Sequence, residues 1–491
     1  MCGVFGVTNV EHASKIAYLG LFALQHRGQE SAGISVTETQ IPDIRTHRDM
    51  GLVADVFKEH TLTALQGNNA IGHVRYSTAG GNTHSNIQPI TANVHGMPVA
   101  LSHNGNIENS KELRNFLESS GSIIHASSDS EIILHLIARS NKLNFIEKLV
   151  SAFEQLTGAF SILLLTPTHL YAVVDSFAYR PLSLGKIQKE NSIESWIIAS
   201  ETCAMDLVGA QFIRDLLPGE ILSIDLSNGE MQSYALHQSR EPNPTPARCV
   251  FEHVYFARPD SLVWNILAQN SRFALGEELA NSLPVAADMV IAVPDSGVPM
   301  AMGYAHASRI PYKIGFIRNH YVGRTFIEPA QNVRNFKVRL KLNPVRETIR
   351  GKKIIVIDDS IVRGTTSRKI IELLYEAGAS EVHLRIGSPP VKFPCFYGID
   401  TPKRKELLAQ QLSLEDMNRF LKSTTLAFLS QTQLLNVMQK LSPSTLCNSK
   451  SKNGGWCVSC FSGEYQKQNT LFQQNPTQNS HPIYGDCQSE C

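Results

Sequence analysis

The stretch Lys353-Ile-Ile-Val-Ile-Asp-Asp-Ser-Ile-Val-Arg-Gly-Thr-Thr-Ser367 decides the architecture of the second half of this 491-residue chain. It opens with an apolar run of strand length, continues with two adjacent acids, and ends in a loop of Gly, Thr and Ser. Apolar residues then recur at helical spacing, at Ile370, Ile371, Leu373, Leu374 and Ala377. The pattern therefore predicts a buried strand, a polar loop and a helix in that order.

A second apolar run, Met289-Val-Ile-Ala-Val293, ends in Pro-Asp-Ser-Gly. Strands separated by helices predict a parallel sheet, and ligands of such sheets lie at the carboxyl ends of the strands. The Gly/Thr/Ser loop would offer backbone N–H groups and hydroxyls to a phosphate at a helix N-terminus. Asp358 and Asp359 suit ribose hydroxyls, directly or through a hydrated Mg²⁺. The loop is neither a Walker loop nor a dinucleotide fingerprint, and the alternative is an exposed strand end with solvated acids.

Length and composition predict two large domains in an ordinary globular protein, with 42% hydrophobic and 18% charged residues. The net charge of +1 gives no long-range attraction to nucleic acid or to an anionic membrane. No apolar run is long enough to cross a bilayer. The apolar segment from Ile16 to Leu24 lacks a basic flank and a cleavage site, so we expect an amphipathic helix in a cytoplasmic protein.

The first half mixes strand-like runs, at residues 99–102, 161–165 and 170–174, with a helical pattern from Ser128 to Ala138. A proline-rich stretch from Gln238 to Ala247 predicts a linker. The chain after Tyr465 is rich in Gln, Asn, Ser and Pro, a composition typical of disordered segments. We expect a first domain at residues 2–236, a linker at 237–248, a second domain at 249–465 and a disordered tail at 466–491.

Cys2 follows the initiator Met1. If Met1 is removed, one residue supplies a thiol nucleophile and a free α-amine whose pKa of roughly 7.7–8.0 suits a general base. The alternative is an ordinary small residue at position 2. The surrounding motifs decide between these two interpretations.

Five motifs follow one another along the first half of the chain. They are Met1-Cys-Gly-Val-Phe-Gly6, Gln25-His-Arg-Gly-Gln-Glu-Ser-Ala-Gly33, Gly72-His-Val-Arg-Tyr-Ser-Thr78, Ser102-His-Asn-Gly-Asn-Ile107 and Ser127-Ser-Asp-Ser-Glu131. In order and extent they resemble the class II, N-terminal-nucleophile glutamine amidotransferases. The resemblance implies a four-layer α/β sandwich in which Cys2 hydrolyses glutamine.

By this resemblance, Arg75 binds the α-carboxylate of glutamine, which suits a planar guanidinium, and Asp129 binds its α-ammonium. The side chain of Asn104 and the backbone N–H of Gly105 form the oxyanion hole. Taken singly, Asn104-Gly105 could be a plain turn and Asp129 a helix-start acid. We expect Arg27 to support the nucleophile's loop and not to touch substrate.

The motif around Asp358 resembles the ribose-phosphate loop of the type I phosphoribosyltransferases, and Val293-Pro-Asp-Ser-Gly297 resembles their pyrophosphate-side turn. The resemblance implies that a phosphoribosyl pyrophosphate binds Asp358, Asp359, Ser360, Arg363, Gly364, Thr365, Thr366 and Ser367. It also implies Mg²⁺ ligands at Ser296, Asp358 and Asp359. The segment Asn319-His-Tyr-Val-Gly-Arg-Thr-Phe-Ile327, with the basic run Arg334 to Lys341, looks like a flap that closes on substrate.

Together the two resemblances imply an α/β and α+β enzyme that hydrolyses glutamine and transfers the ammonia internally to C1 of 5-phosphoribosyl 1-diphosphate. The products would be 5-phosphoribosylamine, glutamate and pyrophosphate, at the start of purine synthesis, from a homotetramer inhibited by purine nucleotides. A glucosamine-phosphate synthase or an asparagine synthetase would share the first half but lack the motif at residues 354–367. A non-catalytic sensor of phosphoribosyl pyrophosphate would not need Cys2, Arg75, Asn104 and Asp129, and a redox sensor built on the C-x-x-C cysteines is a further alternative.

Nine cysteines are too few and too scattered for a disulfide scaffold. Cys249, Cys395, Cys457 and Cys460 match positions at which many members of the resembled family carry 4Fe-4S ligands. Zinc or no metal remains open, because the spacing Cys457-Val-Ser-Cys460 is a modest signal. Cys203 is expected in the core, and no role is assigned to Cys447, Cys487 and Cys491.

Overall fold

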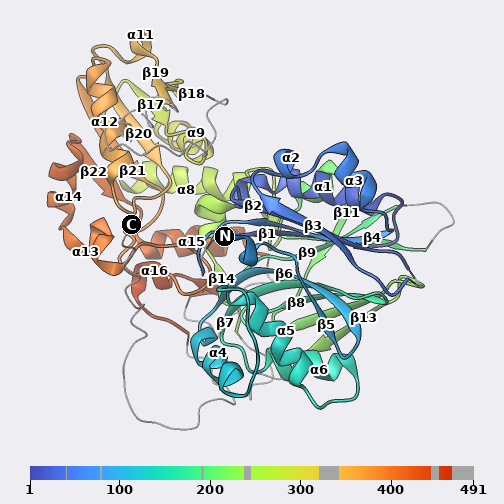
Figure 1. Ribbon diagram of the computed structural model, residues 1–491. Helices are drawn as coiled ribbons and strands as arrows, with labels where there is room; N and C mark the ends of the chain where they lie inside the picture. The colour runs from blue at the N-terminus through green and yellow to red at the C-terminus, as the bar shows by residue number, and fades with distance from the viewer. Residues whose placement is uncertain are drawn as a thin grey trace.

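A computed structural model describes residues 1–39, 41–77, 80–188, 193–236, 245–319, 342–443 and 453–466. The chain forms two lobes, and its amino terminus lies where they meet (Figure 1). The expected flap from His320 onward, the tail from residue 467, and Cys447, Cys487 and Cys491 fall outside the described residues.

Two antiparallel sheets build the first lobe. The seven-stranded sheet has the order β11 (Gln211–Asp215), β9 (Ser183–Ile187), β10 (Ser195–Ala199), β1 (Gly3–Val7), β4 (Asn69–Arg75), β2 (Ser31–Thr37) and β3 (Arg45–Met50). The six-stranded sheet has the order β13 (Met231–Ala235), β12 (Glu220–Asp225), β8 (His169–Val174), β7 (Gly158–Leu165), β6 (Met97–Ile107) and β5 (Ile90–Val94). The predicted strand segments at 99–102, 161–165 and 170–174 lie in β6, β7 and β8.

The two sheets pack face to face around a core that includes Val4, Ile71 and Leu163. On its other face, the first sheet packs against α1 (Ala13–Ala23) and α7 (Cys203–Leu207). The second sheet packs against α4 (Ser110–Ser119), α5 (Ser130–Arg139) and α6 (Phe145–Phe153). Central strands such as β1 and β7 are buried on both faces, which explains why they are apolar without alternation. The predicted four-layer α/β sandwich is confirmed.

The second lobe contains a parallel sheet of order β17 (Met289–Ala292), β20 (Lys353–Asp358), β21 (Glu381–Ile386) and β22 (Thr425–Phe428). One face packs against α8 (Ala268–Ser282), α9 (Val298–Ser308) and α15 (Gln431–Leu441). The other face packs against α12 (Thr365–Glu376) and α14 (Leu414–Leu421). The predicted parallel sheet is confirmed, with the acids of the decisive motif at the carboxyl end of β20.

The remaining elements are short: α2 (Val53–Val56), α3 (Glu59–Ala64), β14 (Arg248–Cys249), β15 (Leu262–Val263), β16 (Ile266–Leu267), β18 (Phe316–Arg318), β19 (Leu342–Pro344), α11 (Arg346–Ile349), α13 (Leu408–Gln411), β23 (Trp456–Cys457) and α16 (Ser459–Ser462). Over the described ranges, none of the helices has both the length and the apolar character that crossing a membrane requires. The helix expected at Ile16–Leu24 is α1, which begins three residues earlier.

Candidate active site

Cys2 precedes the central strand β1, so the sheet fixes its backbone. Its amide N–H donates to Asn104 Oδ1 at 3.1 Å, and its thiol donates to the carbonyl oxygen of Tyr76 at 3.6 Å. Tyr76 follows β4 and Asn104 lies on β6, one strand from each of the two packed sheets. The predicted nucleophile therefore lies between the two sheets, beside residues of these two interior strands.

Burial raises the pKa of the Cys2 thiol, while the N-terminal ammonium and Arg75 oppose that rise. Met1 is buried as well, and burial lowers the pKa of its α-amine to about 6. The sulfur of Met1 lies 2.5 Å from Arg180 Nη1. With this pKa, the α-amine of Met1 would be mostly neutral at pH 7.

The predicted oxyanion donors lie beside the thiol. Asn104 is fully buried and accepts from Cys2 through Oδ1, whereas its Nδ2 has no partner in the part of the chain that the structure describes. A buried donor without a partner is costly unless a ligand completes it. Gly105 runs so close to β7 that a Cβ there would lie 1.9 Å from the carbonyl oxygen of Ala159. Only glycine fits this position.

Arg75 and Asp129 bring opposite charges to the same site. Arg75 ends β4, is 3% exposed, and donates through Nη2 to the carbonyls of Gly80 at 3.4 Å and Gly81 at 3.3 Å. Asp129 immediately precedes α5 and accepts from the Ile107 N–H at 2.8 Å through Oδ2. Arg75 lowers the pKa of Cys2 and Asp129 raises it, so both charges act on the thiol. This arrangement can hold a zwitterion above the nucleophile.

Arg27 supports the nucleophile from behind. Its Nε donates to the carbonyl oxygen of Cys2 at 3.0 Å. Gln25 of the same motif accepts from the Val53 N–H at 2.7 Å, which fixes the loop. The supporting role expected for Arg27 agrees with this geometry.

The second group of predicted residues gathers at the end of β20. Ser296 Oγ donates to Asp359 Oδ1 at 2.5 Å, and Ser360 Oγ donates to the other carboxylate oxygen. Asp358 Oδ1 accepts from the Asp359 N–H at 3.0 Å. Burial, with the neighbouring Asp359 carboxylate, raises the pKa of Asp358 well above its ordinary range, and burial also raises that of Asp359. A cation at this position would favour the ionised forms.

The loop after these acids leads into α12. Gly364 adopts φ 73° as the residue before the helix, and Thr365 and Thr366 are exposed in the first turn while Ser367 is buried. Arg363 points instead to Glu406, with Nη2 at 2.9 Å from Oε2. The structure thus brings together all of the predicted loop residues except the side chain of Arg363.

The four predicted cluster cysteines come from three segments. Cys249 and Cys457 are register partners in the parallel pair β14–β23, and the carbonyl of Cys460 accepts from the Lys392 and Phe393 N–H groups at 3.0 Å each. Cys395 and Cys457 pack into one apolar cluster with Tyr179 and Tyr397. Burial raises the pKa of Cys249 to about 12 and that of Cys457 to about 11, with other thiols of the group adding to each shift.

Across the described ranges, no three His, Cys, Asp or Glu side chains are gathered closely enough to hold a metal ion. The four thiols nevertheless lie near one another, since the other three each raise the pKa of Cys460. Four cysteine thiolates are the donor set of a 4Fe-4S cluster, and a single zinc ion accepts the same set. Cys203, by contrast, is a buried core residue beside Ala204 and Met205.

Sequence reasoning missed the contacts that the second lobe makes with this site. Asn106 Nδ2 donates to the Phe396 carbonyl at 2.9 Å, and Tyr179 stacks on Tyr397 with ring centroids 4.0 Å apart. Gly398, at φ 93°, approaches Gly105 so closely that a Cβ would lie 3.0 Å from its carbonyl carbon. These contacts join residues more than 200 positions apart, and the sequence carries no local signal for them.

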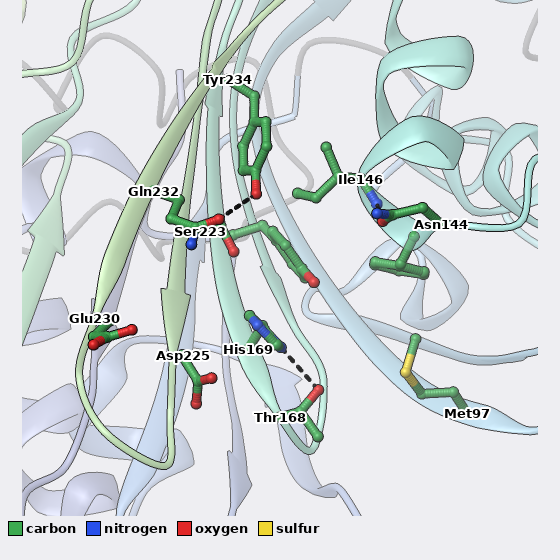
Figure 2. Close-up of a pocket in the computed structure, with 12 residues that line it drawn as sticks. Met97, Asn144, Ile146, Thr168, His169, Ser223, Asp225, Glu230, Gln232 and Tyr234 are labelled. Carbon is green, nitrogen blue, oxygen red and sulfur yellow. Dashed lines mark hydrogen bonds between the residues drawn. The ribbon is translucent and has the colours of Figure 1, made fainter.

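A separate hollow of about 330 Å³ lies between the second sheet and the start of α6 (Figure 2). His169 and Tyr171 stack in it with ring centroids 5.5 Å apart, and Asp225 and Glu230 line one side. None of the predicted site residues contributes to it. It belongs to neither site.

Comparisons with known proteins agree with this geometry. Residues 73–206 match the glutamine amidotransferase domain family, and residues 263–386 match the phosphoribosyl transferase domain family. The chain is 47% identical to amidophosphoribosyltransferase 1, chloroplastic, of Arabidopsis thaliana, over 94% of this chain and 78% of the relative. It is 42% identical to the amidophosphoribosyltransferase of Bacillus subtilis, over 94% of each chain. A solved structure of glutamine phosphoribosylpyrophosphate amidotransferase from B. subtilis, complexed with ADP and GMP, matches with a TM-score of 0.86 and 42% identity, over 96% of this chain and 99% of that one.

Proposed function

This chain belongs to the amidophosphoribosyltransferase family, and on that premise we propose which of its residues carry each half of the reaction. The enzyme hydrolyses glutamine and transfers the ammonia to C1 of 5-phosphoribosyl 1-diphosphate. The products are 5-phosphoribosylamine, glutamate and pyrophosphate, and the reaction is the first step of purine biosynthesis.

Cys2 is the proposed nucleophile of the glutaminase half. After Met1 is removed, the α-amine of Cys2 takes the thiol proton, and the thiolate attacks the side-chain carbonyl carbon of glutamine. The unpartnered Nδ2 of Asn104 and the N–H of Gly105 stabilise the oxyanion. The protonated amine then returns the proton to the leaving ammonia, and water hydrolyses the resulting thioester.

Arg75 and Asp129 are the proposed ligands of the glutamine α-carboxylate and α-ammonium. Both are nearly buried, and both act electrostatically on Cys2, which supports placing a zwitterion between them. An amide that lacks the α-carboxylate and the α-ammonium would lose both contacts. The pair therefore selects for an α-amino acid.

In the second half, the loop from Asp359 to Ser367 is the proposed binding site for the ribose 5-phosphate, with Asp358 and Asp359 directed to the ribose. Ser296, Asp358 and Asp359 offer only oxygen donors, which fit Mg²⁺, a cation that usually combines one or two carboxylates with substrate phosphates. When bound, Mg²⁺ would neutralise charge on the departing pyrophosphate. The exposed Thr365 and Thr366 and the N–H groups in the first turn of α12 would hold the phosphate.

We also propose a 4Fe-4S cluster on Cys249, Cys395, Cys457 and Cys460. Support comes from the convergence of three segments at four buried or half-buried thiols. Its role would be structural, since neither half-reaction moves electrons. Protein purified without air should be brown, with about four iron and four sulfide per chain, measured by metal and sulfide analysis. Zinc in place of iron, or a colourless active enzyme, would contradict this assignment.

Further proposals concern the assembly and its setting. We propose domains at 2–236 and 249–465, a homotetramer, inhibition by purine nucleotides and a cytoplasmic location. The B. subtilis structure complexed with ADP and GMP supports nucleotide inhibition. Some plant relatives are chloroplastic, so cell fractionation is the test of location.

The single observation that carries the residue assignment is the unpartnered Asn104 Nδ2 beside a buried, N-terminal thiol. Its test measures pyrophosphate release from phosphoribosyl pyrophosphate, first with glutamine and then with ammonia. Cys2→Ala should abolish the glutamine-dependent rate and keep the ammonia-dependent rate, because Cys2 only generates ammonia. Loss of the ammonia-dependent rate in a folded Cys2→Ala protein would refute this division of labour.

A further inference from the structure

A buried cluster of charges joins the two lobes behind Cys2. It consists of Arg27, Arg180 and Glu201 from the first lobe and Glu252 from the second, and all four side chains are fully buried. Glu252 begins a short π-helix, Glu252–Phe256, just after β14. Two guanidinium groups thus face two carboxylates, and His26 Nε2 lies 2.8 Å from Glu201 Oε1.

Glu252 engages Arg27 through both carboxylate oxygens. Arg27 Nη1 donates to Glu252 Oε2 at 3.0 Å and Nη2 donates to Oε1 at 2.9 Å, while Arg180 Nη1 lies 3.4 Å from Oε1. This parallel pair of bonds fixes the plane of the Arg27 guanidinium as a single contact could not.

The third nitrogen of the same guanidinium reaches the nucleophile. Arg27 Nε donates to the carbonyl oxygen of Cys2 at 3.0 Å, and Asn104 Oδ1 accepts from the Cys2 N–H at 3.1 Å. The backbone of Cys2 is therefore held at both its ends. One of these two supports is oriented by a carboxylate from the other lobe.

Removing the charge of Glu252 would shift this balance. Burial lowers the pKa of Arg27, but the carboxylates of Glu252 and Glu201 have the larger combined effect and raise this pKa above its ordinary value. Without Glu252, Arg27 would keep only Glu201, which also binds Ser261 Oγ at 2.7 Å and the Arg258 N–H at 2.9 Å. The guanidinium would turn toward Glu201, and its Nε would leave the Cys2 carbonyl.

We propose that Glu252 is a positioning residue for glutamine hydrolysis: acting through Arg27, it lets the second lobe hold Cys2 in its reactive geometry. This inference rests on the proposed role of Cys2 as the nucleophile. It assigns Glu252 no contact with either substrate. The backbone carbonyl of Glu252, not its carboxylate, lies within reach of Arg272 in the second lobe, at 3.5 Å, so a side-chain change leaves that contact in place.

The test compares Glu252→Gln with wild type in the full-length enzyme. Glutaminase kcat should fall at least about tenfold, while KM for glutamine changes less than about threefold, because Arg75 and Asp129 are untouched. Ammonia-dependent synthesis should stay within about twofold. The matched control is Glu220→Gln, since Glu220 forms a bidentate pair with Arg214, at 2.8 and 2.6 Å, and none of its hydrogen bonds reaches Cys2 or Arg27. The control should leave both rates unchanged.

Glu252→Asp guards against misfolding, because it keeps the charge but retracts the carboxylate. If Glu252→Gln does not fold by circular dichroism, Glu252→Asp must show the selective loss of glutaminase kcat. An equal loss of both activities in the folded variant, or an unchanged glutaminase, overturns the inference. Cys2→Ala runs in the same assay: if it retains glutaminase activity, the proposed function itself is wrong, whereas if it loses that activity and Glu252→Gln does not, only the role of Glu252 fails.

Discussion

At the scale of single residues, motifs identified the groups that we propose to contact substrate, but not the residues that hold those groups in place. Cys2, Arg75, Asn104 and Asp129 each sit in a short local pattern that chemistry explains. Glu252 contacts Arg27 across 225 positions of sequence, and no local pattern marks such a pair. Buried partners of this kind become visible only when the two lobes are seen together.

Processing of Met1 is the first prediction at this scale. The proposed base is the α-amine of Cys2, which a peptide bond to Met1 would block. Fully active enzyme should therefore have the intact mass of the chain without Met1. Cys2→Ala is the control: it should lose Met1 too, which separates peptidase removal from a reaction of the thiol. Retained Met1 in fully active enzyme would disprove this base assignment.

At the scale of elements, periodicity predicted the strands and helices well because burial decides it. The run at 353–357 became the buried strand β20, and the following helical pattern became α12, whose apolar face is buried. The junction elements were harder to predict: β14 and β23 have two residues each, and the π-helix at Glu252–Phe256 has no distinct period. Their packing against distant segments, not their own propensity, forms them.

The π-helix carries a buried histidine whose titration affects stability. His253 Nδ1 and Ser271 Oγ share a hydrogen bond of 3.1 Å, and the His253 ring packs edge-on against Trp456. Burial, with Arg272 nearby, lowers its pKa from 6.5 to about 3. The unfolded chain thus binds one more proton between these values, so the stability contributed by neutral His253 is complete above pH 6.5 and is lost as the pH falls toward 3.

His253→Phe should flatten this dependence while keeping an aromatic ring in place. Between pH 6 and pH 4, the slope of the unfolding free energy should fall by about 1.4 kcal/mol per pH unit, the contribution of one proton. Urea unfolding followed by tryptophan fluorescence measures it. His60→Phe, at an exposed position of α3 (Glu59–Ala64), is the control variant. An identical pH slope in His253→Phe and wild type would show that another group governs acid unfolding.

At the scale of the whole molecule, the two lobes meet beside Cys2. Both lobes could be predicted from the sequence because each has its own motifs. How the lobes pack against each other could not be predicted. The structure packs Gly398 on Gly105 and Glu252 on Arg27, so the second lobe forms one wall of the glutaminase centre. Both contacts bear on groups that act at Cys2, and neither adds a substrate ligand.

The last prediction asks whether the two centres fail separately. In Asp358→Asn with Asp359→Asn, synthesis should fall on the order of 10²–10³-fold with glutamine and with ammonia alike, because both routes need the same activated sugar. The fold should survive, since burial raises the pKa of both carboxyls and so disfavours the charges that the substitutions remove. Glutamine hydrolysis should persist at its basal level and lose stimulation by phosphoribosyl pyrophosphate, which is measured as glutamate release with and without that substrate. Cys2→Ala is the complementary variant, with the glutamine route lost and the ammonia route kept. If the double variant kept ammonia-dependent synthesis, the acids at the end of β20 could not be the groups that place the ribose and its metal.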